Sequence, residues 1–217
     1  MILFKHILLL LVSLTLVSAC NGQGKNNQST YQKPKLNYSQ LDTATFAGGC
    51  FWCVEASFEQ IKGVKEAVSG YAGGKESSPT YKQVSQGLTG HAETVEIYYD
   101  PQVINYGTLL DIFFTAHDPT QLNRQGPDVG KQYRSVIFYH DENQQKLAQD
   151  KIRKLNDSGR FPKKIVTQLV PYSKFWVAED YHQDYEKHHP DNPYIISVSK
   201  PKIEKVAQKF SHLLKEE

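Results

Sequence analysis

The chain has 217 residues, of which 25 are Lys or Arg and 23 are Asp or Glu, so its formal net charge is +2. This length suits one domain with short appendages, and an apolar content of 39% excludes a disordered chain, which cannot bury a core. The nearly balanced charge does not support a general nucleic-acid-binding protein, which carries a basic surplus. Three cysteines are too few for a domain held together by several disulfides.

Residues 1–19 have the pattern of a secretory signal peptide. Lys5 precedes an apolar run of roughly a dozen residues, short for a membrane-spanning helix of about 20. The run ends in Val17-Ser18-Ala19-Cys20, which resembles a bacterial lipobox. This resemblance implies cleavage before Cys20 and lipid on its sulfur. We therefore expect a lipid-anchored protein of the bacterial cell envelope that faces an extracytoplasmic compartment. An ordinary signal peptide, or a merely apolar N-terminus, is the alternative.

Residues 20–41 comprise the expected lipidated Cys20 and a polar segment with few apolar side chains. This composition is typical of a flexible tether. The periodic hydrophobic patterns begin near Asp42, so we expect the folded domain to occupy residues 42–217.

Within that domain, hydrophobic periodicity and turn residues predict alternating strands and helices. Strands are expected at 43–47, 64–71, 93–99, 133–140 and 165–170, and helices at 50–61, from 78, 105–114, 141–156 and 203–214. Alternation alone would suggest a parallel α/β sheet, but these strands are short and alternate polar with apolar residues. The pattern therefore favours an α+β fold, in which helices pack on one face of a sheet and the other face is wet.

The strongest local signal is Gly48-Gly49-Cys50-Phe51-Trp52-Cys53, at a predicted strand-to-helix turn. A cysteine at a helix N-terminus faces unpaired backbone N–H groups and the positive end of the helix dipole, which favour the nucleophilic thiolate. Cys53 follows one helical turn later, a spacing that can close a disulfide as in other C-x-x-C redox motifs.

Two other interpretations of the cysteine pair stay open at this level. Both residues could be small buried hydrophobic side chains, the usual state of a free cysteine. They could also be half of a zinc site, for which His182, His188 and His189 would have to supply the second pair of ligands. Because His188 and His189 adjoin Pro190 in a polar loop, we expect no metal.

Further motifs follow in order along the chain: GYAGG at 70–74, PTY at 79–81, GHAE at 90–93, HDPT at 117–120, NRQGPDVG at 123–130, QYRS at 132–135 and EDYHQ at 179–183. Together with Gly49–Trp52 they resemble the A-type peptide methionine sulfoxide reductases over about Thr45 to Asn192. The resemblance implies a two-layer α+β sandwich similar to the ferredoxin-like plait, with helices packed on a mixed sheet. It implies reduction of the S-epimer of methionine sulfoxide, free or in oxidised proteins. It also implies an external thioredoxin-like protein or dithiol as reductant, and no metal or organic cofactor.

The expected chemistry needs a thiolate that attacks sulfur and an acid that protonates the departing oxygen. Cys50 is the nucleophile, which releases methionine and becomes a sulfenic acid that a thiol can condense with. Glu93 is the expected acid. It shares a strand face with Val95, Ile97 and Tyr99, where desolvation raises the pKa of a carboxyl group. A Glu that reaches solvent at the sheet edge is the alternative.

The resemblance also assigns residues around the substrate. Tyr81 and Tyr133 match two family tyrosines that hydrogen-bond the sulfoxide oxygen. Phe51 and Trp52 match the apolar pocket for the S-methyl group. Asp128 matches a residue near the substrate, although it could equally be a turn residue after a proline.

The chain departs from its relatives in its recycling cysteines. Many relatives place these in a C-terminal tail, but no cysteine follows Cys53 here, and Cys20 would be blocked by lipid. Cys53, where many relatives have Gly, is therefore the only internal candidate that could resolve the sulfenic acid, and attack by an external thiol is the alternative. We expect a monomer that binds the membrane through Cys20.

Two other functions are compatible with parts of this sequence. A general thioredoxin-like thiol-disulfide oxidoreductase of the cell envelope would share the strand, Cys-x-x-Cys, helix order. However, Trp52 lies inside the motif rather than before it, and that fold has no use for an acid with two tyrosines. A non-enzymatic binding lipoprotein is the second alternative.

Overall fold

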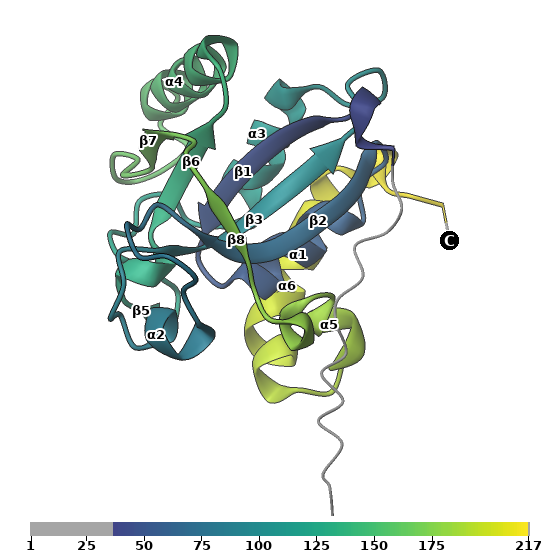
Figure 1. Cartoon of the computed structure of the whole chain (residues 1–217). Coiled ribbons are helices and arrows are strands. Elements are labelled where there is room, and N and C mark those ends of the chain that lie inside the picture. The colour runs from purple at the N-terminus through teal and green to yellow at the C-terminus, as the bar shows by residue number, and fades with distance from the viewer. Residues whose placement is uncertain (1–36, 217) are drawn as a thin grey trace, which may run out of the picture.

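The computed structural model describes residues 37–216 (Figure 1). The predicted signal peptide, Cys20 and most of the predicted tether lie outside the described residues. The last residues of the predicted tether are described: Tyr38–Gln40 form a short 3-10 turn, η1, capped by Asn37. No helix in the described range has the length and apolar character needed to cross a membrane.

One mixed sheet of six strands, in the order β7-β6-β1-β3-β2-β8, forms the centre of the fold. The strands are β1 (Asp42–Gly48), β2 (Val64–Ala72), β3 (Ala92–Tyr99), β6 (Ser135–Tyr139), β7 (Gln168–Pro171) and β8 (Phe175–Val177). Neighbours are antiparallel, except that β6 and β7 are parallel. The order β6-β1-β3-β2 is that of the ferredoxin-like plait, so the predicted α+β class is confirmed.

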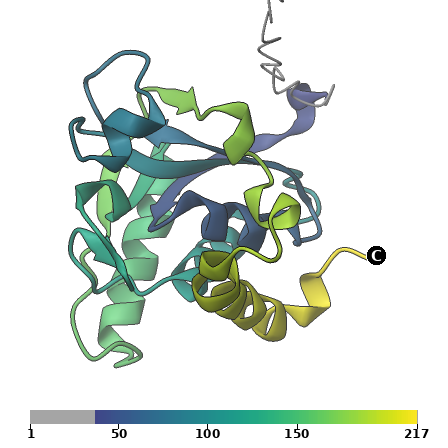
Figure 2. The same ribbon diagram turned by 90° about the horizontal axis from the view of Figure 1, so that it is seen from below.

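Helices cover one face of this sheet, as Figures 1 and 2 show for α1, α3, α4 and α6. Their bounds, with those of the short helices, are α1 (Phe51–Glu59), α2 (Tyr81–Ser85), α3 (Tyr106–Ala116), α4 (Glu142–Asp157), α5 (Tyr185–His188) and α6 (Lys200–Lys209). Local sequence determines where several of them begin. Thr80 and Gln83 form a capping box at α2, and the side chains of Asn105 and Asp141 cap α3 and α4.

The main core lies between the sheet and these helices. Alternate residues of β1 point toward it, and Phe46 stacks on Phe113 of α3 with ring centroids 4.8 Å apart. The ring of Phe58 in α1 also contacts the Phe46 ring, with centroids 5.8 Å apart. All three side chains are fully buried. This aromatic contact joins β1 to both of its covering helices, and so holds the turn between β1 and α1 in place.

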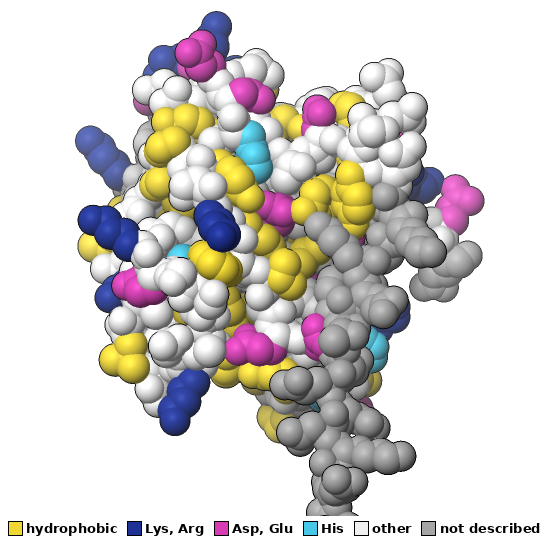
Figure 3. Space-filling view, viewed as in Figure 1, with side chains coloured by type: hydrophobic (Ala, Val, Ile, Leu, Met, Phe, Trp, Pro, Cys, Tyr) yellow, Lys and Arg dark blue, Asp and Glu magenta, His cyan; other side chains and the backbone are white. Residues whose placement is uncertain are grey.

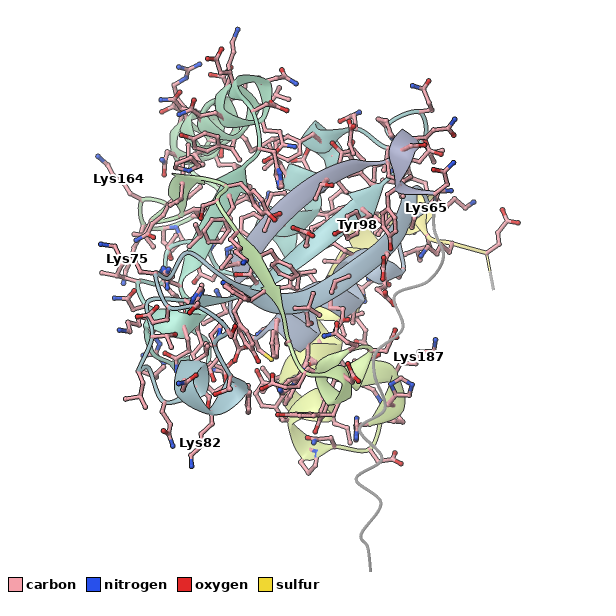
Figure 4. The ribbon with its side chains drawn as sticks, viewed as in Figure 1. Lys65, Lys75, Lys82, Tyr98, Lys164 and Lys187 are labelled. Carbon is pink, nitrogen blue, oxygen red and sulfur yellow. The ribbon has the colours of Figure 1, made fainter. Side chains whose placement is uncertain are left out.

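The sequence pattern predicted that the second face of the sheet would be exposed to water. That prediction is wrong. Glu66 and Glu96 lie on this face with only 4% and 7% of their surfaces exposed. The Tyr38 hydroxyl donates to Glu66 at 2.6 Å, and the Tyr172 hydroxyl donates to Glu96 at 3.0 Å. Tyr98, labelled in Figure 4, also donates to Glu96. On this side of the molecule, shown in Figure 3, hydrophobic side chains lie among acidic ones. Tyrosine hydroxyls thus bind the carboxylates of this face, two of them from residues outside the sheet, Tyr38 and Tyr172.

Several elements differ from the sequence-based expectation. The predicted strand 133–140 begins at Ser135, because residues Lys131–Tyr133 form a 3-10 turn, η2. The predicted helix 203–214 instead begins at Lys200, where Pro201 suits the first turn, and ends at Lys209. Four short elements were not predicted, since segments of this length carry no periodic pattern. They are the hairpin β4 (Arg124–Gln125) and β5 (Asp128–Val129), strand β8 and helix α5.

Candidate active site

Cys50 lies at the tight turn that connects β1 to α1. Gly49 precedes it with φ of +97°, and a Cβ atom there would approach the Gln125 side chain to 2.6 Å. Only glycine fits this position without strain. Cys50 itself is the N-cap residue of α1, at the positive end of that helix.

The Cys50 thiol is nevertheless shielded from solvent, with 5% of its surface exposed. Burial raises its pKa well above the ordinary value, and the neighbouring Cys53 and the carboxyl of Glu93 raise it further. The hydroxyl of Tyr194, within hydrogen-bonding range of the sulfur, acts in the opposite direction. Burial therefore opposes the effect of the helix N-terminus on this thiol.

Glu93 projects from β3 into the same buried space, and 2% of its surface is exposed. Its Oε2 accepts a hydrogen bond from the backbone N–H of Phe51 at 3.1 Å. Burial raises the pKa of Glu93 to about 8, and the charges of Asp128 and Cys53 add to this effect. The predicted desolvation of this carboxyl is therefore confirmed, and a solvent-reaching Glu at the sheet edge is excluded. A carboxyl with this pKa carries a proton at neutral pH and can donate it.

Tyr81 and Tyr133 approach this pair from two different elements. Tyr81 is the first residue of α2, as expected, and its backbone N–H donates to Oε1 of Glu179 at 2.9 Å. Tyr133 lies in η2 rather than at the start of a strand. Burial, followed by the charges of Glu93 and Cys50, raises the pKa of Tyr81 to about 12, and burial and Glu93 raise that of Tyr133. Both hydroxyls therefore stay protonated as hydrogen-bond donors.

The aromatic pair after the nucleophile has two different environments. Phe51 is buried, with its ring centroid 5.9 Å from that of Tyr71 and 6.4 Å from that of Tyr81. Trp52 is half-buried and stacks on Tyr185 of α5 at 3.8 Å. Its indole N–H donates to Nδ1 of His182 at 3.1 Å. Phe51 and Trp52, with His182 and Tyr185, thus form an aromatic wall beside Cys50. His182 and Tyr185 belong to the segment that follows β8.

His182 is the only one of the three proposed zinc ligands placed in this wall. Its ring accepts the Trp52 hydrogen bond, and burial lowers its pKa to about 4, so it stays neutral. Within residues 37–216, no three His, Cys, Asp or Glu side chains lie close enough together to hold a metal ion.

Asp128, in β5, is connected to the site by a hydrogen bond from Tyr194, a residue that the sequence analysis did not single out. The hydroxyl of Tyr194 donates to Oδ2 of Asp128 at 2.7 Å, and the same residue lies beside the Cys50 sulfur. Tyr194 also meets the Trp52 ring edge to face, at 6.0 Å between centroids. Tyr194 lies in the first helical turn before η4 (Ile195–Ser199), where the Asn192 side chain accepts a hydrogen bond from its backbone N–H. The sequence predicts no helix here, so only the long-range contact reveals its position.

Cys53 lies in the first turn of α1, with 3% of its surface exposed and a hydrogen bond to Cys50. Neither cysteine is in a disulfide. The Cys53 sulfur is 3.0 Å from the hydroxyl of Ser199, and the Lys202 ammonium is 3.9 Å away. The pKa of Cys53 is lowered to about 7, chiefly by Cys50 and then by Lys202 and Ser199, against the opposing effect of burial.

Comparison with known proteins agrees with this geometry. The family model for peptide methionine sulfoxide reductase matches residues 42–214. The peptide methionine sulfoxide reductase MsrA of Pasteurella multocida is 53% identical over 172 residues, which cover 79% of this chain and 98% of that protein. The MsrA of Natronomonas pharaonis is 51% identical over 169 residues, covering 78% of this chain and 95% of that protein.

Solved structures give the same result. The crystal structure of reduced Mxr1 from Saccharomyces cerevisiae has a TM-score of 0.65 and 37% identity, and the match covers 70% of this chain and 88% of Mxr1. Methionine sulfoxide reductase A of Corynebacterium diphtheriae has a TM-score of 0.63 and 34% identity, covering 70% of this chain and 76% of that one. Because the family model spans the whole described sheet and both cysteines, this chain belongs to the peptide methionine sulfoxide reductase family.

Proposed function

We propose that this methionine sulfoxide reductase acts on the S-epimer through Cys50 and Glu93, with Cys53 as the resolving thiol. The observation that carries the proposal is the burial of the Glu93 carboxyl, bonded to the Phe51 N–H, beside the two free cysteines. A sulfoxide oxygen leaves sulfur only once it is protonated, so the nucleophile and the acid must meet at one substrate atom.

In the first step the Cys50 sulfur attacks the sulfoxide sulfur, and the proton of Glu93 goes to the sulfoxide oxygen. The oxygen passes to Cys50 as a sulfenic acid, methionine leaves, and the Cys50 proton replaces the one that Glu93 gave. Tyr81 and Tyr133 donate hydrogen bonds to the same oxygen. Phe51 and Trp52 surround the S-methyl group, a sulfur–aromatic contact that contributes ~0.3–1.5 kcal/mol.

In the second step Cys53 attacks the sulfur of the sulfenic acid. A disulfide forms, the S–O bond breaks, and the hydroxyl leaves as water with a proton from Glu93, which is replaced by the proton that Cys53 gives up, directly or through solvent. An external dithiol then reduces the disulfide, and we propose a thioredoxin-like protein for this role. The reductant supplies both electrons and both protons, so the cycle converts methionine sulfoxide and a dithiol into methionine, water and a disulfide.

The test follows turnover of each methionine sulfoxide epimer by the purified protein with dithiothreitol. We expect turnover of the S-epimer only, and its loss in Cys50→Ser. In Cys53→Ser we expect one equivalent of methionine in a single turnover and slow recycling afterwards. Full steady-state turnover in Cys53→Ser would show that the external thiol resolves the sulfenic acid. Insulin disulfide reduction without turnover of either epimer would favour the general oxidoreductase.

We also propose that the protein is a monomer anchored by lipid on Cys20 in the bacterial cell envelope, facing an extracytoplasmic compartment. The lipobox-like Val17–Cys20 sequence and the polar residues after it support this proposal. Growth with an alkyne-bearing fatty acid should label the wild-type protein but not Cys20→Ser. Equal labelling of both would contradict the anchor, and light scattering of the delipidated protein would test the monomer.

A further inference from the structure

The second cysteine of the pair has its own polar site, built by a segment far away in sequence. Ser199 and Lys202 lie 146 and 149 residues after Cys53, yet both reach its sulfur. Ser199 is completely buried, and it ends a π-helical turn, η4 (Ile195–Ser199), that leads into α6. Such turns are rare and occur frequently at functional sites.

Lys202 brings a positive charge to the same sulfur from the helix that continues η4. Its ammonium lies 3.9 Å from the Cys53 sulfur. The serine hydroxyl and the lysine cation thus approach Cys53 from one helical segment.

The two sulfurs differ in their charged surroundings. Burial disfavours a negative sulfur on Cys50, and so does Glu93 whenever its carboxyl is ionised. Cys53 faces the cation of Lys202 and the hydroxyl of Ser199, and both favour a negative charge on its sulfur. The carboxylate of Asp128 opposes this charge, but its effect is weaker. A single negative charge shared by the hydrogen-bonded pair therefore resides on Cys53.

We propose that Ser199 and Lys202 are positioning residues that hold Cys53 as the thiolate that resolves the Cys50 sulfenic acid. The inference rests on the proposed function of Cys53. In the resolving step the Cys53 thiolate forms the S–S bond, the S–O bond of Cys50 breaks, and Glu93 gives the proton that makes the departing hydroxyl into water. The oxidant is the sulfenic acid itself, so no further reactant is needed.

The site predicts a loss that depends on pH. If the pKa of Cys53 rose from about 7 to its ordinary 9.0, the thiolate fraction at pH 7 would fall about fifty-fold. Thiolates of higher pKa are also better nucleophiles, which compensates about eight-fold and leaves a rate loss of roughly five- to six-fold. The groups that act on this sulfur are Cys50, Glu93, Asp128, Tyr194, Ser199 and Lys202.

The experiment uses single turnover without reductant in wild-type protein, Lys202→Met, and Lys202→Met combined with Ser199→Ala. Acid-quenched samples are analysed by mass spectrometry for methionine, sulfenic acid trapped by dimedone, and disulfide. We expect unchanged methionine release, and disulfide formation slower at pH 7 in the double variant by up to about five-fold, the limit reached if the whole lowering of the pKa is lost. The loss should disappear near pH 8, above which the variant should form the disulfide faster than wild type, and Lys202→Arg should restore the wild-type profile. Lys205→Met, exposed on the same helix, is the matched control.

Two results would overturn the inference. One is a wild-type rate and pH profile of disulfide formation in both Lys202→Met and the double variant Lys202→Met with Ser199→Ala. The other is an equal loss of methionine release at every pH, which would indicate a structural role only. Cys53→Ser separates this inference from the proposed function. If it still forms an intramolecular disulfide or recycles at full rate, the role of Cys53 itself is wrong. If it does not, but Lys202→Met behaves as wild type, only the role of Lys202 is wrong.

Discussion

Replacing Glu93 with Gln should stabilise the folded protein at neutral pH while it abolishes turnover. The carboxyl is buried, and in the folded chain its pKa lies at about 8 against an ordinary 4.5. Between these two pH values the folded chain holds a proton that the unfolded chain has lost. The stability of the wild type therefore falls as pH rises through this window, whereas Gln carries no titrating group.

The magnitude follows from the two pKa values. Each pKa unit corresponds to about 1.4 kcal/mol, so at pH 7 the wild type has lost about 3 kcal/mol relative to its stability below pH 4.5. Above pH 8 the loss reaches its limit of about 5 kcal/mol. The Gln side chain can still accept the Phe51 N–H bond through its amide oxygen, so the packing of the turn is preserved.

Urea unfolding of the reduced proteins at pH 5, 6, 7 and 8 measures this difference directly. The free energy of unfolding of Glu93→Gln minus that of the wild type should grow by about 1.4 kcal/mol per pH unit. Glu204→Gln, an exposed position on α6, controls for the loss of one carboxyl group. A difference that stays constant with pH, or that shrinks as pH rises, would refute the argument that burial sets the proton affinity of Glu93.

Three further predictions concern positions around the site. Glu179→Gln weakens the charge-assisted bond that holds the N–H of Tyr81, so kcat should fall about ten-fold with KM within two-fold; an unchanged kcat would contradict this role. His117 is buried and neutral with its pKa lowered to about 4, so it contributes stability above pH 6.5 that is lost as pH falls toward 4. Urea unfolding of His117→Gln should therefore show a flatter acid limb than the wild type, and parallel limbs would count against it. Phe113→Ala should lower the free energy of unfolding by about 3–5 kcal/mol, and a loss under 1 kcal/mol would mean that the core refills the space.

The central part of the fold follows from local patterns. β1, α1, β3, α3 and α4 were predicted close to their observed bounds, because each has a regular hydrophobic period and a capping or turn residue beside it. The short elements β8 and α5 were missed, since they form by pairing with β2 and by stacking on Trp52 rather than by any periodicity of their own.

The candidate site divides in the same way. The burial of Glu93 could be predicted, because residues two apart on a strand share one face and its neighbours on that face are apolar. Tyr194, Ser199 and Lys202 could not, because their roles depend on contacts across more than a hundred residues of chain. The position of Cys50 at a helix N-terminus could be predicted, because the glycine turn and the helical period are visible in the sequence, but the depth of its burial could not.

The long separation between Cys53 and Lys202 has a consequence for biosynthesis. At a synthesis rate of ~5–20 residues per second, the ribosome makes Lys202 roughly 7–30 s after Cys53. During that interval the nascent chain already carries both thiols, but it lacks the segment that covers them and the cation that sets their charge. An oxidant present then meets two unshielded cysteines in an incomplete protein. Newly made copies should therefore be more easily inactivated than finished ones, and a chaperone that shields the nascent N-terminal half would protect the later activity.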